Sequence, residues 1–211
     1  KGVGHRVVQG GEEFSHSEEI TDKLERVIEE LTPLAPLHNP ANLVGYRAFK
    51  KALPKVKHVA VFDTAFHATM EAQDYMYPVP YEYYEKHKVR RYGFHGTSHL
   101  YLSQQAKVYL KEGQSKIITC HIGSGASLCA IKDGKCVATS MGLTPLPGVM
   151  MGTRTGDIDP SVITYMSKQT GKTCEDIYNE LNKKAGFLGI SGVSNDSRDV
   201  EKGANEGNER C

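Results

Sequence analysis

The residues from Arg91 to His99 gather a cation, two aromatic rings, two glycines, two histidines and two small hydroxyl side chains in one short stretch. Its glycines flank Phe94 and His95, so the backbone can turn sharply there and approach a ligand closely. The hydroxyl side chains are suitable N-caps for a helix that we predict over residues 98–110. The free N–H groups and the dipole at such a helix start favour a bound anion. A helix entry with a packed phenylalanine and a surface histidine explains the same residues about equally well.

Phosphoryl transfer to a carboxylate is a reaction for which the polar residues of the chain are suited. Two anions must meet in that reaction, so the site needs fixed cations and hydrogen-bond donors. Arg6 and Arg154 each lie beside glycines, and the planar guanidinium fork matches both carboxylate and phosphoryl oxygens. His95 can donate to an equatorial oxygen of the phosphoryl group in transfer. Taken singly, each has an ordinary explanation as well, which is a surface arginine or a structural histidine.

Asp63 follows a short apolar run, residues 56–62, that we predict to be a buried strand. Ligands bind at the carboxyl ends of strands in open α/β sheets. There the carboxylate can orient Mg²⁺ through water, or align His95 or Arg6, and its ordinary explanation is a helix or turn cap. We expect Mg²⁺ because it typically bridges protein carboxylates and substrate phosphates. His95 and His99 have the spacing of a helical metal pair, but His95 precedes the helix and no third ligand is evident, so we reject zinc there.

Composition and charge exclude several classes of function. The chain of 211 residues has 26 basic and 25 acidic side chains, a formal net charge of +1, and no apolar run that approaches a membrane span. This balance argues against nucleic-acid or membrane binding driven by charge. The five cysteines are odd in number and form no C-x-x-C pair. We therefore expect reduced thiols in the cytoplasm and not a disulfide framework.

Hydrophobic spacing and turn residues in the N-terminal part predict a strand near Val7-Val8 and two helices before the strand of residues 56–62. An amphipathic helix is predicted over residues 18–31, with Ser15 and Glu18 at the spacing of a capping box. Pro40 suits the first turn of the next helix, which we predict to end near Ala52.

A glycine-rich turn at Gly123-Ser124-Gly125 separates two of the strands predicted in the middle of the chain. Asp133-Gly134 is a tight hairpin turn before the third strand. A glycine-rich turn with free N–H groups can cradle phosphates, although most such turns are only turns. The three strands are predicted over residues 116–121, 126–132 and 135–139.

The C-terminal part is predicted to be mainly helical. Helices are expected after Asp159-Pro160 and after the capping pattern Thr173-x-x-Asp176, and a further helix opens within residues 195–199. Residues 140–156 are predicted to form a long loop, a kind of segment that is usually functional when ordered. Residues 186–194 are predicted to be a glycine-rich link.

Three blocks together resemble the acetate kinase family and occur in the family's order, namely residues 4–8, 92–99 and 151–160. The resemblance covers essentially the whole chain. It implies an α/β, two-domain, ribonuclease H-like fold of the acetate and sugar kinase/Hsp70/actin superfamily. Family members are longer at both ends, so a central part that is incomplete at both ends is expected. On this basis we assign residues 1–64 to an N-terminal, acyl-side domain and residues 65–211 to the first part of a nucleotide-side domain.

The resemblance also implies roles for individual residues, and it assigns none as a direct metal ligand. The reaction centre of acetate kinases matches Arg6, Asp63, His95 and Arg154. Their small apolar pocket for the acyl methyl group matches Val8, Leu37, Phe94 and Pro145, with His38 nearby. Nucleotide binding is implied for His121, Gly123, Ser124, Gly125, Asp196, Ser197 and Arg198.

A few positions depart from the family pattern. Ser124 stands where members often have Asn, and a hydroxyl can still donate to phosphate. Ser197 stands where some members have an aromatic residue, which bears on the adenine contacts. Gln9 replaces a histidine. Pro147 replaces a glutamate, for which we have no functional interpretation.

The resemblance implies that the intact enzyme converts ATP and acetate to ADP and acetyl phosphate with Mg²⁺, as a homodimer, with no nucleic-acid or membrane partner. We favour a dimer or domain interface for the tyrosine-rich loop over residues 75–81. The 211 residues alone are expected to have negligible turnover. A kinase for propionate or butyrate is also possible, and a smaller residue than Val8 would favour it. A non-catalytic nucleotide-binding module is a third possibility, against which the presence of all four reaction-centre residues counts.

Overall fold

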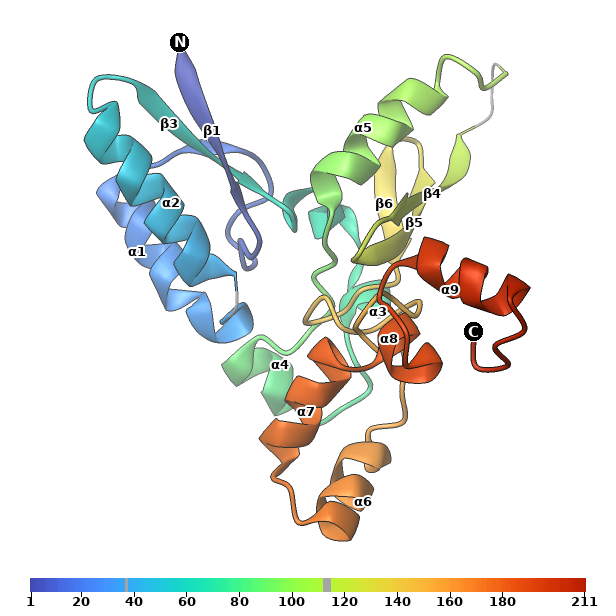
Figure 1. Ribbon diagram of the computed structural model, residues 1–211. Helices are drawn as coiled ribbons and strands as arrows, with labels where there is room; N and C mark the ends of the chain where they lie inside the picture. The colour runs from blue at the N-terminus through green and yellow to red at the C-terminus, as the bar shows by residue number, and fades with distance from the viewer. Residues whose placement is uncertain (37, 112–114) are drawn as a thin grey trace. The chain divides into compact units, whose positions relative to one another are not determined.

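The computed structural model describes residues 1–36, 38–111 and 115–211, which form a mixed set of helices and strands (Figure 1). The chain divides into two compact units. Unit 1 consists of Lys1–Thr119 and Cys129–Thr144, and unit 2 consists of Cys120–Leu128 and Pro145–Cys211. The assignment of residues 1–64 and 65–211 to two domains of a whole protein stays a prediction.

The first sheet of unit 1 has the strand order β1-β3-β2. β1 (Gly2–Val7) runs parallel to β3 (Lys57–Phe62), and β2 (Glu18–Glu19) pairs antiparallel with β3. The strand predicted before Asp63 is thereby confirmed, and Asp63 lies at its carboxyl end. Side chains alternate between buried and more exposed positions along β3, because successive residues of a strand point to opposite faces.

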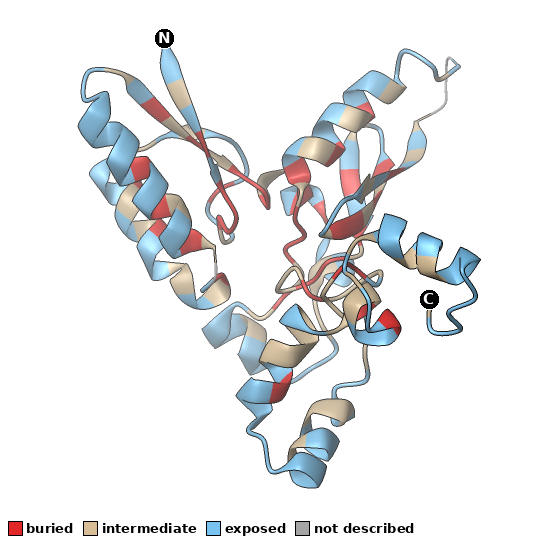
Figure 2. Ribbon diagram, in the orientation of Figure 1, coloured by how far each residue is buried: buried red, intermediate tan, exposed pale blue. Residues whose placement is uncertain are grey.

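Two helices, α1 (Asp22–Glu30) and α2 (Asn39–Ala52), pack together beside this sheet (Figure 1). Pro40 stands in the first turn of α2, as predicted. Figure 2 shows buried positions on β1, β3 and both helices. The apolar core between these elements consists of Val7, Phe14, Leu24, Ile28, Leu43, Tyr46, Ala60 and Phe62.

The helix predicted over residues 18–31 begins later than expected. Glu18 and Glu19 pair with β3 as an edge strand, so their backbone is extended. The helix start is Thr21, whose hydroxyl oxygen accepts a hydrogen bond from the backbone N–H of Leu24 at 3.2 Å. The capping box predicted from Ser15 is therefore wrong, because pairing with the sheet edge determines the conformation before Thr21.

The remaining part of unit 1 contains short helices and most of a second sheet of order β4-β5-β6, in which the end of β4 and the start of β5 belong to unit 2. The strands agree with their predicted positions. In the hairpin between β5 and β6, the turn residues Asp133 and Gly134 have φ of 52° and 78°, as a two-residue turn requires. The strands are β4 (Lys116–Ile122), β5 (Ala126–Lys132) and β6 (Lys135–Thr139). The helices are the 3₁₀ helices η1 (Thr32–Leu34) and η2 (Ala65–Thr69), and α3 (Ala72–Tyr75), α4 (Tyr81–His87) and α5 (Gly96–Ala106).

Unit 2 is mainly helical. The predicted capping box forms, with the Thr173 hydroxyl accepting from the Asp176 backbone N–H at 3.0 Å. The prediction of a glycine-rich link over residues 186–194 is wrong for its first part, because Gly186–Ser191 forms helix α8. The helices of unit 2 are α6 (Ser161–Thr170), α7 (Cys174–Lys183), α8 (Gly186–Ser191) and α9 (Ser197–Asn205). In the ranges that the structure describes, no helix is both long and apolar enough to cross a membrane.

Candidate active site

Arg6 and Asp63 form a bidentate ion pair beside the carboxyl ends of the parallel strands β1 and β3. Arg6 Nε donates to Asp63 Oδ1 at 2.9 Å, and Arg6 Nη2 donates to Asp63 Oδ2 at 2.6 Å. The Asp63 side chain is 3% exposed and the Arg6 side chain 64%. A buried carboxylate thus fixes a guanidinium that a solute can still reach. The hydrogen bond to Asp63 raises the pKa of Arg6 and keeps it cationic.

The backbone of Asp63 holds the turn that carries His95. The Asp63 carbonyl oxygen accepts from the Gly96 N–H at 2.9 Å, and a Cβ on Gly96 would overlap that oxygen. His95 adopts a left-handed conformation with φ 60° and ψ 24°, which is uncommon for a residue with a side chain. The prediction that α5 starts near Ser98 is wrong, because the left-handed His95 is its N-cap and Gly96 its first residue.

Phe94, which precedes His95, is packed into the interior of unit 1 and is 1% exposed. Its carbonyl oxygen lies 2.8 Å from His67 Nε2. Gly93 has φ 76°, and a Cβ there would lie 2.6 Å from Thr139 Cγ2 and 2.7 Å from the His67 ring. The packed phenylalanine expected of a plain helix entry is therefore present, while His95 itself is half-buried.

The residues predicted to form an apolar pocket are only partly located. Val8, directly after β1, is buried, and so is Phe94. Pro145 is half-buried and belongs to unit 2. Leu37 lies outside the described residues. The pocket itself stays a prediction.

Asn39 ties the segment after β1 to the start of α2, a role that sequence reasoning did not identify. Its Oδ1 accepts from the Gln9 backbone N–H at 3.1 Å, and its Nδ2 donates to the carbonyl oxygens of Gln9 and Ile28, both at 3.2 Å. Asn42 of the same helix accepts from the Val8 backbone N–H at 3.1 Å. These amides position the residues that follow Arg6, and the two asparagines are three residues apart in the sequence, which is one helical turn.

In unit 2, the glycine turn predicted to cradle phosphate lies next to two other loops. The Gly123 N–H donates to the Gly125 carbonyl at 3.1 Å, and the Ser124 carbonyl accepts from the Gly152 N–H at 3.3 Å. A Cβ on Gly152 would lie 2.9 Å from the Asn195 carbonyl oxygen. The turn and the segment that opens α9 are therefore neighbours of the same glycine. His121, at the end of β4, is half-buried.

The start of α9 is organised by Asp196. Its carboxylate accepts from the backbone N–H of Arg198 at 2.9 Å and also pairs with the Arg198 guanidinium. The hydrogen bond from the Arg198 side chain is the main cause that lowers the pKa of Asp196 to about 2. Ser197, the first residue of the helix, is exposed. All three residues are therefore placed at one helix start.

Arg154 is a partly buried cation held by neutral groups. Its Nη1 donates to the Pro145 carbonyl oxygen at 3.2 Å and lies 3.8 Å from the Met151 sulfur. No carboxylate among the described residues forms an ion pair with it. Burial lowers the pKa of Arg154. An anionic ligand would compensate this charge, because a desolvated cation without a counter-ion is costly.

The predicted site residues thus fall into two groups, each assembled within its own unit. In unit 1 the structure joins Arg6, Asp63 and the turn of His95. In unit 2 it joins Arg154 to Pro145, and the glycine turn to the segment before α9.

Comparison with known proteins gives one family. The model of the acetokinase family matches residues 1–211. The acetate kinase of Lachnoclostridium phytofermentans is 57% identical over 211 residues, which cover 99% of this chain and 53% of the relative. The acetate kinase of Bacillus subtilis is 56% identical, over 100% of this chain and 54% of the relative. The chain spans about half the length of these curated relatives.

Solved structures agree with this result. The acetate kinase of Porphyromonas gingivalis superposes with a TM-score of 0.92 at 53% identity, over 99% of this chain and 53% of that one. A propionate kinase from Francisella tularensis superposes with a TM-score of 0.94 at 47% identity, over 99% of this chain and 54% of that one. The α/β fold of acetate and propionate kinases is therefore the fold of this chain.

Proposed function

Because this chain belongs to the acetokinase family, we propose that the whole protein catalyses Mg²⁺-dependent, reversible phosphoryl transfer from ATP to acetate, giving acetyl phosphate and ADP. The observation that carries the proposal is the double role of Asp63. Its side chain fixes the Arg6 guanidinium, and its carbonyl oxygen fixes the turn of His95. One buried residue thereby sets the relative position of a cation and a hydrogen-bond donor, which transfer between two anions requires.

In this proposal Arg6 binds the carboxylate of acetate. A carboxylate oxygen attacks the γ-phosphorus of ATP, a new O–P bond forms, and the bond to the bridging oxygen of ADP breaks. Neither carboxylate nor ADP exchanges a proton in this step, so no general base is needed. Protein catalysis then consists of orientation and charge stabilisation, with His95 and Arg154 as donors to the oxygens of the phosphoryl group.

The Mg²⁺ of the reaction would be held mainly by substrate phosphates. Both carboxylate oxygens of Asp63 already accept hydrogen bonds from Arg6, so Asp63 suits a contact through water better than direct ligation. Mg²⁺ typically keeps several waters and takes one or two carboxylates beside the phosphates, so this donor set fits. When bound, the ion neutralises charge on the phosphoryl oxygens.

We place ATP against the glycine turn and the start of α9. The exposed Ser124 hydroxyl is a suitable phosphate donor, whereas the Gly123 N–H already donates to the Gly125 carbonyl. The closeness of the glycine turn to Gly152, and of Gly152 to Asn195, supports a single nucleotide site that includes His121, Asp196, Ser197 and Arg198.

We propose acetate as the preferred acceptor because the family resemblance assigns Val8 and Phe94, both of which are buried, to a small apolar pocket for the acyl methyl group. One additional methylene changes binding by about 1–3 kcal/mol, so propionate would be a poorer substrate and not an excluded one. A propionate kinase is the second candidate, and the similarity to the Francisella tularensis structure favours it over a butyrate kinase.

We also propose that the whole protein is a cytoplasmic homodimer. All five cysteines are unpaired, which is usual in a reducing compartment. Tyr81 and Tyr83 of α4 are 61% and 46% exposed and Val79 before them is 43% exposed, which supports an interface at this segment.

The test is formation of acetyl phosphate, trapped as hydroxamate, from Mg-ATP with acetate, propionate or butyrate. The whole protein and the 211-residue chain are assayed side by side, and the Arg6→Ala variant of the whole protein serves as the matched control. We expect turnover in the whole protein, highest with acetate and clearly lower in the variant. Highest turnover with propionate would favour the second candidate, and no turnover with any acid would contradict both.

A further inference from the structure

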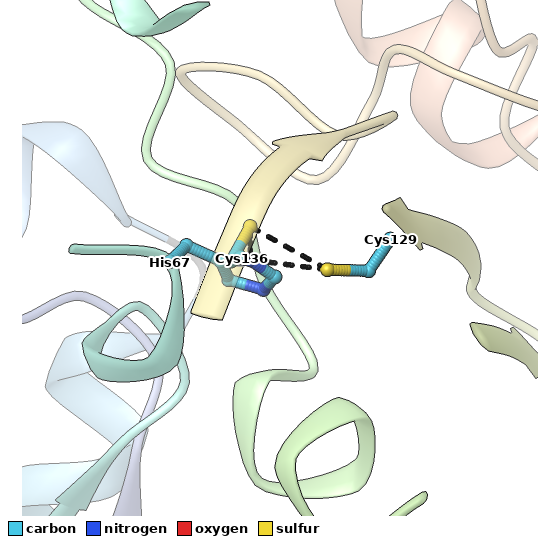
Figure 3. A group of neighbouring side chains, drawn as sticks. All are labelled: His67, Cys129 and Cys136. Atoms are coloured by element: carbon cyan, nitrogen blue, oxygen red, sulfur yellow. Dashed lines mark hydrogen bonds between the residues drawn. The ribbon is translucent and has the colours of Figure 1, made fainter. Parts of the chain in front are cut away.

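Three buried side chains outside the proposed site converge inside unit 1. His67 comes from η2, Cys129 from β5 and Cys136 from β6, and Figure 3 shows their polar atoms turned toward one another. His67 Nδ1 lies 3.1 Å from Cys136 Sγ and 4.0 Å from Cys129 Sγ, and the two sulfur atoms are 3.5 Å apart. All three residues are 0% exposed. These three side chains have no role in the proposed phosphoryl transfer, so their convergence needs its own explanation.

The tautomer of His67 is fixed by its other ring nitrogen. Nε2 lies 2.8 Å from the Phe94 carbonyl oxygen, which can only accept, so Nε2 carries the proton. Nδ1 therefore presents a lone pair to the two sulfur atoms. Metal-bound histidines are oriented in this way, with one nitrogen on the metal and the other donating to a carbonyl or carboxylate.

From this geometry we propose that His67, Cys129 and Cys136 bind a thiophilic metal ion, for which Zn²⁺ is the divalent candidate. A tetrahedral zinc with Zn–S of about 2.3 Å and Zn–N of about 2.0 Å separates its ligand atoms by about 3.5–3.8 Å. The observed separations of 3.1, 3.5 and 4.0 Å differ from these values by at most about 0.5 Å. Small side-chain rotations would therefore bring all three ligand atoms within bonding distance of one ion.

Charge and surroundings favour the same class of ion. Two thiolates neutralise a divalent cation, and a neutral imidazole adds no charge, so the loaded site has no net charge to bury. Met70 and Ile131 pack against the cysteines in a buried apolar cluster. Soft sulfur ligands in such surroundings select zinc or copper(I) over Mg²⁺.

The bound ion would also connect to the proposed reaction centre. Fixing His67 fixes the hydrogen bond to the Phe94 carbonyl, and Phe94 directly precedes the left-handed His95. The metal would thus act as a structural clamp on the turn before α5. This role is independent of the phosphoryl transfer proposed above, because binding does not require substrate.

The test is the metal content of the whole protein, purified without chelator and again after addition of Zn²⁺ and gel filtration. We expect about one zinc per chain, and loss of that zinc in Cys129→Ser and Cys136→Ser. Cys174→Ser, which changes an exposed cysteine at the start of α7, is the matched control and should keep the metal. Zinc content equal in all four proteins, or negligible in all, would overturn the proposal.

A second measurement does not depend on buried substitutions. Co²⁺ added to the unmodified protein should give thiolate-to-cobalt charge-transfer absorption, which excess Zn²⁺ abolishes. No such absorption would overturn the proposal, and the three side chains would then be a hydrogen-bonded thiol cluster. A peptide map of the purified protein that shows Cys129 and Cys136 joined by a disulfide would equally overturn it.

Discussion

The two arginines proposed to act on the reacting groups are held in opposite ways. Arg6 in unit 1 is held by a buried carboxylate through two charge-assisted hydrogen bonds. Arg154 in unit 2 is held by a backbone carbonyl and a thioether, with no carboxylate partner among the residues described. The charge of the Arg6 guanidinium is compensated by Asp63 before a ligand arrives, whereas the charge of the Arg154 guanidinium has no carboxylate partner among the described residues. We infer that Arg154 contributes more to stabilising an anion and Arg6 more to orientation.

The largest expected effect is at Arg154. In the whole protein, Arg154→Ala should lower kcat by about 10²–10³-fold, because it removes an uncompensated charge from the oxygens of the transferring phosphoryl group. Arg154→Lys should recover part of this loss, since it keeps the charge but not the planar fork. Steady-state kinetics measure both. Arg47→Ala removes an exposed arginine paired with Glu25 on α1 and is the control. An unchanged kcat in Arg154→Ala would contradict the inference that Arg154 stabilises the charge of the transferring phosphoryl group.

A smaller effect is expected at Asp63. Asp63→Asn keeps the shape of the side chain but removes the charge that orients Arg6, so kcat/KM for acetate should fall by about 10–10²-fold. The KM for ATP should change little. If the KM for ATP rises as much as that for acetate, Asp63 does more than orient Arg6. Circular dichroism shows whether the variant is folded.

The elements that depend on local sequence could be predicted, and those that depend on distant contacts could not. The capping box at Thr173 and the hairpin at Asp133 formed as expected, because their signals lie within a few residues. The predicted start of α1 was wrong because β3, far along the chain, pairs with Glu18 and Glu19. Helix α8 was missed because its glycines are poor helix formers, and the structure uses them for close packing.

The same distinction holds at the candidate site. Sequence reasoning left open whether Asp63 aligns Arg6, aligns His95 or contacts Mg²⁺, and the structure shows a direct contact with Arg6. The cluster of His67 was not anticipated. Its two cysteines lack a metal-binding spacing, and the histidine is more than 60 residues away in the sequence, so only the fold brings them together.

Each arginine region also depends on one glycine, and the two can be compared directly. A Cβ on Gly96 would overlap the Asp63 carbonyl, and a Cβ on Gly186 would overlap the Met151 carbonyl and lie 2.8 Å from that of Arg154. Gly96→Ala and Gly186→Ala should each lower the free energy of unfolding by about 1–3 kcal/mol. Gly186→Ala should cost about 1 kcal/mol more, since φ at this residue is +62°. Urea unfolding of the whole protein measures both.

The control for this comparison is Gly171→Ala at the end of α6. Gly171 also has a left-handed φ, of 72°, but a Cβ there would meet nothing within 4 Å. Its substitution should cost about 1 kcal/mol from the backbone conformation alone. A cost for Gly96→Ala below that of Gly171→Ala would contradict the idea that close backbone approach holds the His95 turn.

The smallest effect concerns pH and is specific to the strand that carries Arg6. Burial, and next the neighbouring His58, lower the pKa of His5 from its usual 6.5. The unfolded chain therefore binds this proton more tightly than the folded chain, so stability is complete above about pH 6.5 and declines as the pH falls through that value. We expect a loss of about 1 kcal/mol or less between about pH 7.5 and about pH 5.5, measured by urea unfolding. His5→Phe keeps the edge-on ring contact with Tyr46 but cannot titrate, so its loss should be smaller. An equal loss in both proteins would assign the pH dependence to other groups.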